Sequence, residues 1–213
     1  MSTERPNPLA NLGIFRLETL EDGIFAIAMT LLVLNLKVPS KLDDSLMMAI
    51  LQIWPNLVTF FGSFLLLGVF WFGHRAALDY IKHADHVFHW LNILLLMFVS
   101  ILPFSASLIA KYYYEQAAVI IYGFNLILIG LTMYIQWVYA TRNYRLIDKD
   151  MSVFVIKFAK LRTIFPPISY TLAILLSFID LKISLVLYTL IPVLYVLPVF
   201  LPFWRLMARI PFL

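Results

Sequence analysis

Six long apolar segments dominate this sequence and restrict what it can fold into. They lie at about 14–36, 50–73, 88–110, 118–140, 164–180 and 183–203. A membrane-spanning helix needs about 20 mostly apolar residues. The chain is 62% hydrophobic and only 13% charged, whereas soluble domains are about 25% charged. The sequence therefore predicts an all-α integral membrane protein, in which residues 1–213 form one six-helix transmembrane domain with no soluble domain.

Prolines and one polar tripeptide shape the last two segments. Pro166-Pro167 is expected to break the start of the fifth, and Pro192, Pro198 and Pro202 interrupt the sixth. Between the two segments only Asp180-Leu181-Lys182 is polar, so we expect a tight hairpin there. One long broken helix over the same stretch is the alternative.

The distribution of basic residues predicts the orientation. Twelve of the 16 Lys and Arg residues fall in the N-terminal segment, the second and fourth loops and the C-terminal tail. Cytoplasmic loops carry the excess of Lys and Arg, so both termini are expected in the cytoplasm. The 141–163 loop is basic and amphipathic, and it is expected on the inner surface, against anionic lipid headgroups. Because the basic residues are spread between apolar runs, nucleic acid is not an expected partner.

The first segment carries charge where a spanning helix normally does not. Its uncharged part, 23–36, has 14 residues and would cover about 21 Å of the roughly 30 Å hydrocarbon core. The turn with Arg16, Glu18, Glu21 and Asp22 must therefore enter the membrane or its interface. Ionisable groups at that depth usually face the bundle interior or water, although headgroup anchoring is an alternative for these carboxylates. Asp22, the deepest, is expected to be paired.

Beyond Asp22, a stripe of residues follows helical spacing. Intervals of three, four and seven residues place its members on one face; they are Gly23, Ile27, Thr30, Leu31 and Leu34. Taken alone, this pattern is typical of an apolar helix that faces lipid or packs in a bundle.

Polar residues of the next two helices are expected at the same membrane level. His74 and Arg75 end the second helix, and Asn92 lies early in the third. Neighbouring helices joined by a short loop pack antiparallel, so we expect Asp22 to meet Arg75 or His74. Asn92 needs hydrogen-bond partners when buried, and the charged cluster would supply them.

Neither a catalytic site nor a metal site is expected. The sequence has no GxSxG, P-loop or GxGxxG motif. His83, His86 and His89 recur every three residues, but nothing completes a recognised zinc signature. We therefore expect a protein that is not an enzyme and has no cofactor.

The first helix resembles the signature of the transmembrane protein 175 potassium channels. That signature is an arginine, three residues, Phe-Ser-Asp and an apolar run, and here Arg16 is followed by Leu20-Glu21-Asp22. The resemblance covers about the first 105 residues; it continues at Trp71, His74-Arg75, Asn92 and Leu102-Pro103-Phe104. Since Leu20-Glu21 replaces Phe-Ser, we expect a rearranged hydrogen-bond network and a more acidic inner mouth.

This resemblance implies a homotetramer in the prokaryotic plasma membrane, since single-repeat members assemble as tetramers. It implies a pore lined by the first helix of each subunit, with apolar rings at Ile27, Leu31 and Leu34 and the Thr30 hydroxyl near the narrowest point. Potassium would be the permeant ion, modestly preferred over sodium, without a TVGYG filter. Arg16, Glu21, Asp22, His74, Arg75 and Asn92 would form a polar network at the inner mouth. A secondary transporter of a small cation or solute is the alternative, because prolines in the last two helices could break them near mid-membrane.

Overall fold

The computed structural model describes residues 8–37 and 46–196. Within these ranges the chain forms six helices of 16 to 26 residues and one short helix. The prediction of an all-α fold with six long helices is confirmed. The helices are α1 (Pro8–Leu31), α2 (Leu46–Gln52), α3 (Trp54–Leu78), α4 (His86–Lys111), α5 (Gln116–Thr141), α6 (Val153–Leu176) and α7 (Leu181–Val196), with 3-10 turns at Leu32–Asn35 and Arg142–Tyr144.

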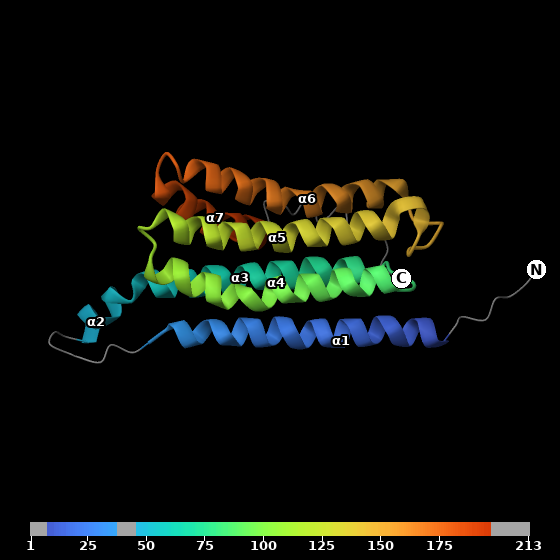
Figure 1. The fold of residues 1–213 in the computed structure, drawn as a ribbon, viewed down its shortest axis with the longest axis horizontal. Helices are drawn as coiled ribbons and strands as arrows, with labels where there is room; N and C mark the ends of the chain where they lie inside the picture. Colours follow the sequence, from blue (N-terminus) through green and yellow to red (C-terminus); the bar gives the residue numbers. More distant parts are fainter. Residues whose placement is uncertain (1–7, 38–45, 197–213) are drawn as a thin grey trace, which may run out of the picture.

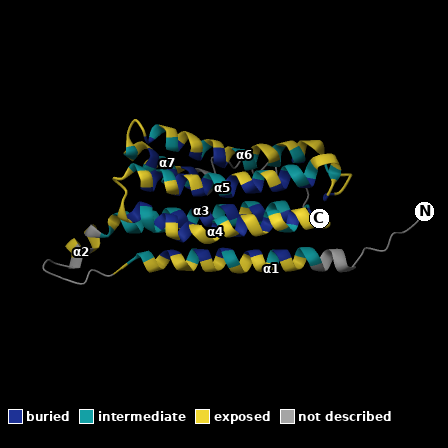
Figure 2. Ribbon diagram, in the orientation of Figure 1, coloured by how far each residue is buried: buried dark blue, intermediate teal, exposed yellow. Residues whose placement is uncertain are grey.

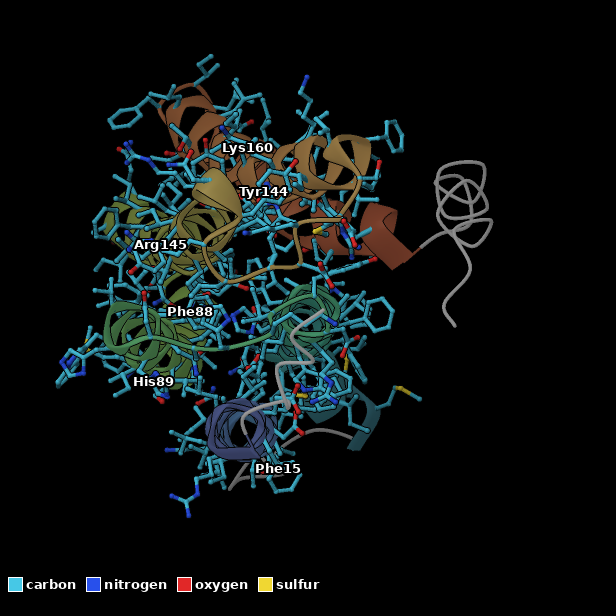
Figure 3. The ribbon with its side chains drawn as sticks, turned by 90° about the vertical axis from the view of Figure 1, so that its right-hand side faces the viewer. Phe15, Phe88, His89, Tyr144, Arg145 and Lys160 are labelled. Atoms are coloured by element: carbon cyan, nitrogen blue, oxygen red, sulfur yellow. The ribbon has the colours of Figure 1, made fainter. Side chains whose placement is uncertain are left out.

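The long helices pack side by side as a bundle with α1 at one edge (Figure 1). There α1 contacts α3 and α4, while α5 packs against α4, and α6 and α7 cover α5 and α3. Successive long helices run in opposite directions, so α1, α4 and α6 begin at the end of the bundle where α3 and α5 finish. Figure 3 looks onto this end and shows Phe15, His89, Arg145 and Lys160 there.

This end of the bundle, which we call the basic end, holds most of the described Lys and Arg residues. They include Arg16, Arg75, Lys82, Arg142, Arg145, Lys149, Lys157 and Lys160. Its assignment to the cytoplasmic side of the membrane stays a prediction from the charge distribution.

Three described helices, α3, α4 and α5, are long and apolar enough to cross a membrane by length and composition. The apolar stretch of α7, Leu181–Val193, is shorter. Large apolar side chains are exposed along the outside of the bundle, among them Phe104, Phe124 and Ile168. Such a surface is compatible with lipid rather than with water.

The structure corrects the predicted start of the fifth segment. α6 begins at Val153 instead of 164, so 153–163 is part of a packed helix and not a surface loop. Pro166 and Pro167 lie inside α6, where the sequence predicted a break. A proline in a helix leaves the carbonyl four residues earlier without its amide partner. For Pro166 that carbonyl belongs to Arg162, and the Tyr195 hydroxyl donates a hydrogen bond to it at 3.3 Å.

Close packing on α5 also holds this part of α6 in place. A Cβ atom on Gly130 of α5 would lie 2.8 Å from Pro167 Cδ, so only a glycine admits the proline ring at this distance. The tertiary fold thus offsets the local cost of the two prolines.

Between α6 and α7 the chain turns as a tight hairpin. α6 ends at Leu176 and α7 begins at Leu181, and the Lys182 amide donates to Asp180 Oδ1 at 2.8 Å. The alternative of one long broken helix is wrong. Pro192 lies within α7, whereas Pro198, Pro202 and the predicted helix end at 203 lie outside the described residues.

The first two segments also differ from their predicted limits. α1 begins at Pro8 instead of 14, and its last turn tightens to a 3-10 helix over Leu32–Asn35. The segment expected at 50–73 is split at Ile53 into α2 and α3, and α3 continues to Leu78. Pro55, in the first turn of α3, explains the new start, because proline suits that position of a helix.

Candidate functional site

The two faces of α1 have opposite environments (Figure 2). Leu17, Phe25, Ala28 and Leu32 are buried against the bundle. Gly23 and Thr30 are exposed on the other side. The three apolar residues of the predicted stripe share that side and remain 56%, 42% and 66% exposed; they are Ile27, Leu31 and Leu34. The stripe that the periodicity placed on one face is therefore the outward face of α1 in the single chain.

Thr30, the polar member of this stripe, forms a hydrogen bond within its own helix. The Thr30 hydroxyl donates a hydrogen bond to the Ile27 carbonyl at 2.8 Å. Leu34 lies in the 3-10 turn rather than in α1 itself, so the stripe ends in a tightened backbone.

The buried carboxylate on α1 is Glu21, which is 2% exposed. Its Oε1 forms a hydrogen bond with His74 Nδ1 of α3. The other ring nitrogen, His74 Nε2, lies 2.7 Å from Gln136 Oε1 of α5, and Gln136 Nε2 donates to Asn92 Oδ1 of α4 at 3.5 Å. One polar chain, Glu21–His74–Gln136–Asn92, therefore links α1 to three other helices.

His74 holds the central position in this chain, because its two ring nitrogens contact Glu21 on one side and Gln136 on the other. A buried carboxylate is costly unless it is paired, so the contact with His74 offsets the burial of Glu21.

The neighbouring acidic residues have other partners. Asp22 is exposed, and its Oδ1 accepts a hydrogen bond from Trp71 Nε1 at 2.8 Å. Glu18 Oε2 forms an ion pair with Arg75 Nη1 at 3.0 Å. The expected pairing of Asp22 with Arg75 or His74 is therefore wrong. Each residue turns a helix by about 100°, so Asp22 points well away from the direction of Glu21.

Two further expectations about this cluster change. The substitution of glutamate for the family serine does not place an extra free carboxylate at the surface, because Glu21 is buried against His74. The expected gain in acidity at the mouth from Glu21 is therefore wrong.

The structure does not join Arg16 to the predicted polar network. Arg16 is exposed, and within the described ranges no hydrogen bond or ion pair joins it to another residue.

The other end of α1 is held by an interaction that the sequence reasoning missed. Asn35 Nδ2 donates to the Pro103 carbonyl at 3.4 Å, and Asn56 Nδ2 donates to the Asn35 carbonyl at 3.3 Å. Asn35 and Gln136 share a signal that could have found them, since each is an amide within or directly after an apolar run. The first segment is thus held near the middle of α1 by Glu21 and just after α1 by Asn35.

Comparison with known proteins gives the context of this arrangement. A protein-family model described as "Endosomal/lysosomal potassium channel TMEM175" matches residues 16–103. A protein of Streptomyces collinus named as a potassium channel is 30% identical over 186 residues, which cover 84% of this chain and 90% of that protein. A second, from Chamaesiphon minutus and also named as a potassium channel, is 33% identical over 175 residues, 79% of this chain and 86% of that protein.

A solved structure agrees with the sequence relatives. The crystal structure of a lysosomal potassium-selective channel TMEM175 homolog from Chamaesiphon minutus superposes with a TM-score of 0.77 and 29% identity. The match covers 85% of this chain and 95% of that chain. The fold and these relatives define an integral membrane protein of the ion-channel class and not an enzyme. The chain belongs to the TMEM175 family.

The buried position of Glu21 generates a prediction that separates it from Asp22. Replacement Glu21→Ala leaves His74 in the core without its carboxylate, and breaking a buried pair costs about 3–5 kcal/mol. Asp22→Ala removes one exposed hydrogen bond, worth about 1 kcal/mol. Thermal unfolding of both variants in mild detergent should show the larger loss for Glu21→Ala. An equal loss, or a larger one for Asp22→Ala, would contradict this assignment.

Proposed function

We propose that four copies of this chain form a potassium channel in a prokaryotic plasma membrane, with their α1 helices around the ion pathway. The observation that carries the proposal is the exposed stripe on α1, opposite a buried face that is anchored to the bundle. Relatives that this chain matches over most of their length are named as potassium channels. α1 lies at the edge of the bundle, where it is accessible to other copies (Figure 1).

The stripe has the shape needed for several helices around one axis. Gly23 and Ala26 are small and exposed, so neighbouring α1 helices can approach closely at that level. Further along, Ile27, Leu31 and Leu34 would form successive apolar rings. Such rings gate by excluding water, and with it the ion's hydration shell. Small outward movements of the helices would wet the rings and open the path.

Selectivity in this arrangement comes from side chains, with no ring of backbone carbonyls. The Thr30 oxygen is the polar group on the stripe nearest to Ile27, and it would contact a partly dehydrated ion. Side chains define the positions of oxygen ligands less strictly than a carbonyl filter does, so we expect only a modest preference for potassium over sodium.

The mouth at the basic end would attract cations mainly through Asp22. Glu18 and Glu21 have basic partners, Arg75 and His74, whereas Asp22 is exposed and bonds only to the indole of Trp71 among the described residues. Four copies of Asp22 would raise the local cation concentration. Arg16, exposed on the same helix, would offset part of this effect. The depth of Asp22 in the sequence predicts a paired residue, whereas its carboxylate is exposed and accepts a hydrogen bond from Trp71.

The alternative of a secondary transporter rested on prolines that would break the last two helices near mid-membrane. The described part of the structure does not favour it. In the described part of the chain, Pro166 and Pro167 lie within α6 and Pro192 lies within α7.

Reconstitution in liposomes with a potassium gradient tests the proposed function. We expect potassium efflux when a proton carrier supplies counter-charge, and a current that rises linearly with driving force. The same protein in mild detergent should have the native mass of four chains. A flux that saturates and requires a coupled ion would identify a transporter, and a purely monomeric protein would remove the four-helix pathway.

The role of Ile27 can be tested at the proposed constriction. Ile27→Asn places amides in an otherwise dry ring, and lowering the barrier by about 1.4 kcal/mol raises the rate tenfold. We therefore expect a leak current at least about tenfold larger, with a smaller preference for potassium over sodium. Ile27→Leu should change little, because it keeps an apolar side chain of similar volume.

Two matched controls distinguish an effect on ion permeation from an effect on folding. Ile24→Asn, at a half-buried position one turn earlier, should have a weaker effect on permeation. Leu32→Asn, at a site 1% exposed, should reduce folding instead. Sodium and potassium fluxes of Ile27→Asn equal to those of the parent would exclude Ile27 from the pathway.

A further inference from the structure

The turn that ends the exposed stripe has side-chain pairs on opposite sides. It is the 3-10 turn Leu32–Asn35, which follows directly after α1. In such a turn, side chains three residues apart point in the same direction. Leu31 and Leu34 form one such pair, and both are exposed, at 42% and 66%. Leu32 and Asn35 form the other pair, in which Leu32 is buried and Asn35 is half-buried. The geometry of the turn thus links the direction of Leu34 to that of Asn35.

The buried side of this turn is tied to two other helices. Asn35 Nδ2 donates to the Pro103 carbonyl of α4 at 3.4 Å. The Asn35 carbonyl accepts a hydrogen bond from Asn56 Nδ2 of α3 at 3.3 Å. Leu32, on the same side, packs in the apolar core of the bundle. Contacts with α3 and α4 therefore hold the turn, while Leu34 stays exposed on its other side.

The contact on α4 lies where the hydrogen-bond ladder of that helix is interrupted. Pro103 has no amide hydrogen, so the carbonyl four residues earlier has no amide partner in the helix. A second amide side chain reaches this part of α4, because Asn125 Nδ2 of α5 donates to the Phe98 carbonyl at 3.1 Å. Both Asn35 and Asn125 thus bind carbonyls of α4, but Asn35 belongs to the segment that carries the stripe.

We propose that Asn35 is a positioning residue for Leu34, whose side chain forms the outermost apolar ring. The role of that ring rests on the proposed function, in which the stripe lines the ion pathway. A 3-10 helix turns about 120° per residue and an α-helix about 100°. Without the two hydrogen bonds of Asn35, the turn can relax to α-helical geometry. Leu34 would then rotate by about 60° relative to Leu31, over three residues.

The apolar rings of the stripe therefore depend on different contacts. The buried contact of Glu21 precedes Ile27 on α1, whereas the hydrogen bonds of Asn35 directly follow Leu34. Loss of the Asn35 side chain should change the outermost ring and leave the ring at Ile27 in place. The position of Leu34 is thus set by α3 and α4 as well as by its own helix.

Cysteine labelling measures the direction of these side chains without any ion flux. The sequence has no cysteine, so each introduced thiol is the single reactive group. The rate at which a charged thiol reagent modifies Leu34→Cys in mild detergent would be compared with and without Asn35→Leu. Loss of one hydrogen bond shifts a conformational equilibrium about fivefold, and we expect a change in rate of that size. The rate at Ile27→Cys should stay that of the parent background.

Asn125→Leu is the matched control, because it also removes an amide that donates to a carbonyl of α4. Both leucine variants should lower the midpoint temperature of thermal unfolding, but only Asn35→Leu should change the rate at Leu34→Cys. Asn56→Leu removes the other hydrogen bond of the turn and should change this rate in the same direction; it carries the test if Asn35→Leu protein does not fold.

Two results would overturn the proposal. One is an unchanged rate at Leu34→Cys in Asn35→Leu protein with parental helix content, or in Asn56→Leu protein where Asn35→Leu does not fold. The other is an equal change in rate in Asn125→Leu protein, which would show a general loosening of the bundle.

Flux measurements separate this inference from the proposed function. In liposomes, Asn35→Leu should lower the ratio of potassium to sodium flux, whereas Asn125→Leu should keep the parent ratio. A changed rate at Leu34→Cys with no potassium flux through the parent would reject the channel and keep the role of Asn35. Potassium flux through the parent with unchanged thiol rates would reject the role of Asn35 and keep the channel.

Discussion

The contact between Glu21 and His74 is the interaction on which the position of α1 depends. Within the described part of the chain, the long helices that pack against α1 are α3 and α4, and the outward face of α1 stays exposed. A buried carboxylate is costly unless it is paired, and Glu21 meets that requirement only when α1 takes one rotation against α3. The hydrogen bond from Asn35 to the Pro103 carbonyl holds the chain just after α1. Together they orient the exposed stripe without touching it.

The same pairing explains how three neighbouring acidic residues take different roles. Helix geometry directs Glu18 toward Arg75, Glu21 into the core and Asp22 toward the surface. A serine at position 21 would be too short to span the space that the Glu21 side chain fills. Glutamate in this chain therefore strengthens the link between α1 and α3 rather than adding charge at the surface. The exposed carboxylate of this cluster is Asp22, which the family signature also has.

Hydropathy and periodicity predicted the six long helices and the stripe on α1, because these depend on local spacing and on the lipid environment. They did not predict which carboxylate is buried, since Glu21 and Asp22 differ by one residue and the choice depends on where α3 lies. The helical course of α6 through Pro166 depends on Tyr195, which is 29 residues further along the chain. Gln136 likewise joins the buried polar chain only because α3 and α4 place His74 and Asn92 beside it. These are tertiary interactions that no local pattern encodes.

The buried polar contact limits how far α1 can move. Breaking a buried pair costs about 3–5 kcal/mol, and a ligand shifts an equilibrium only by the difference in its affinity for the two states. Small displacements of α1 that widen or narrow the proposed apolar rings can keep the contact between Glu21 and His74, whereas release of α1 from the bundle would break it. The polar contact therefore sets the architecture, and the proposed opening is a small shift of α1 within it.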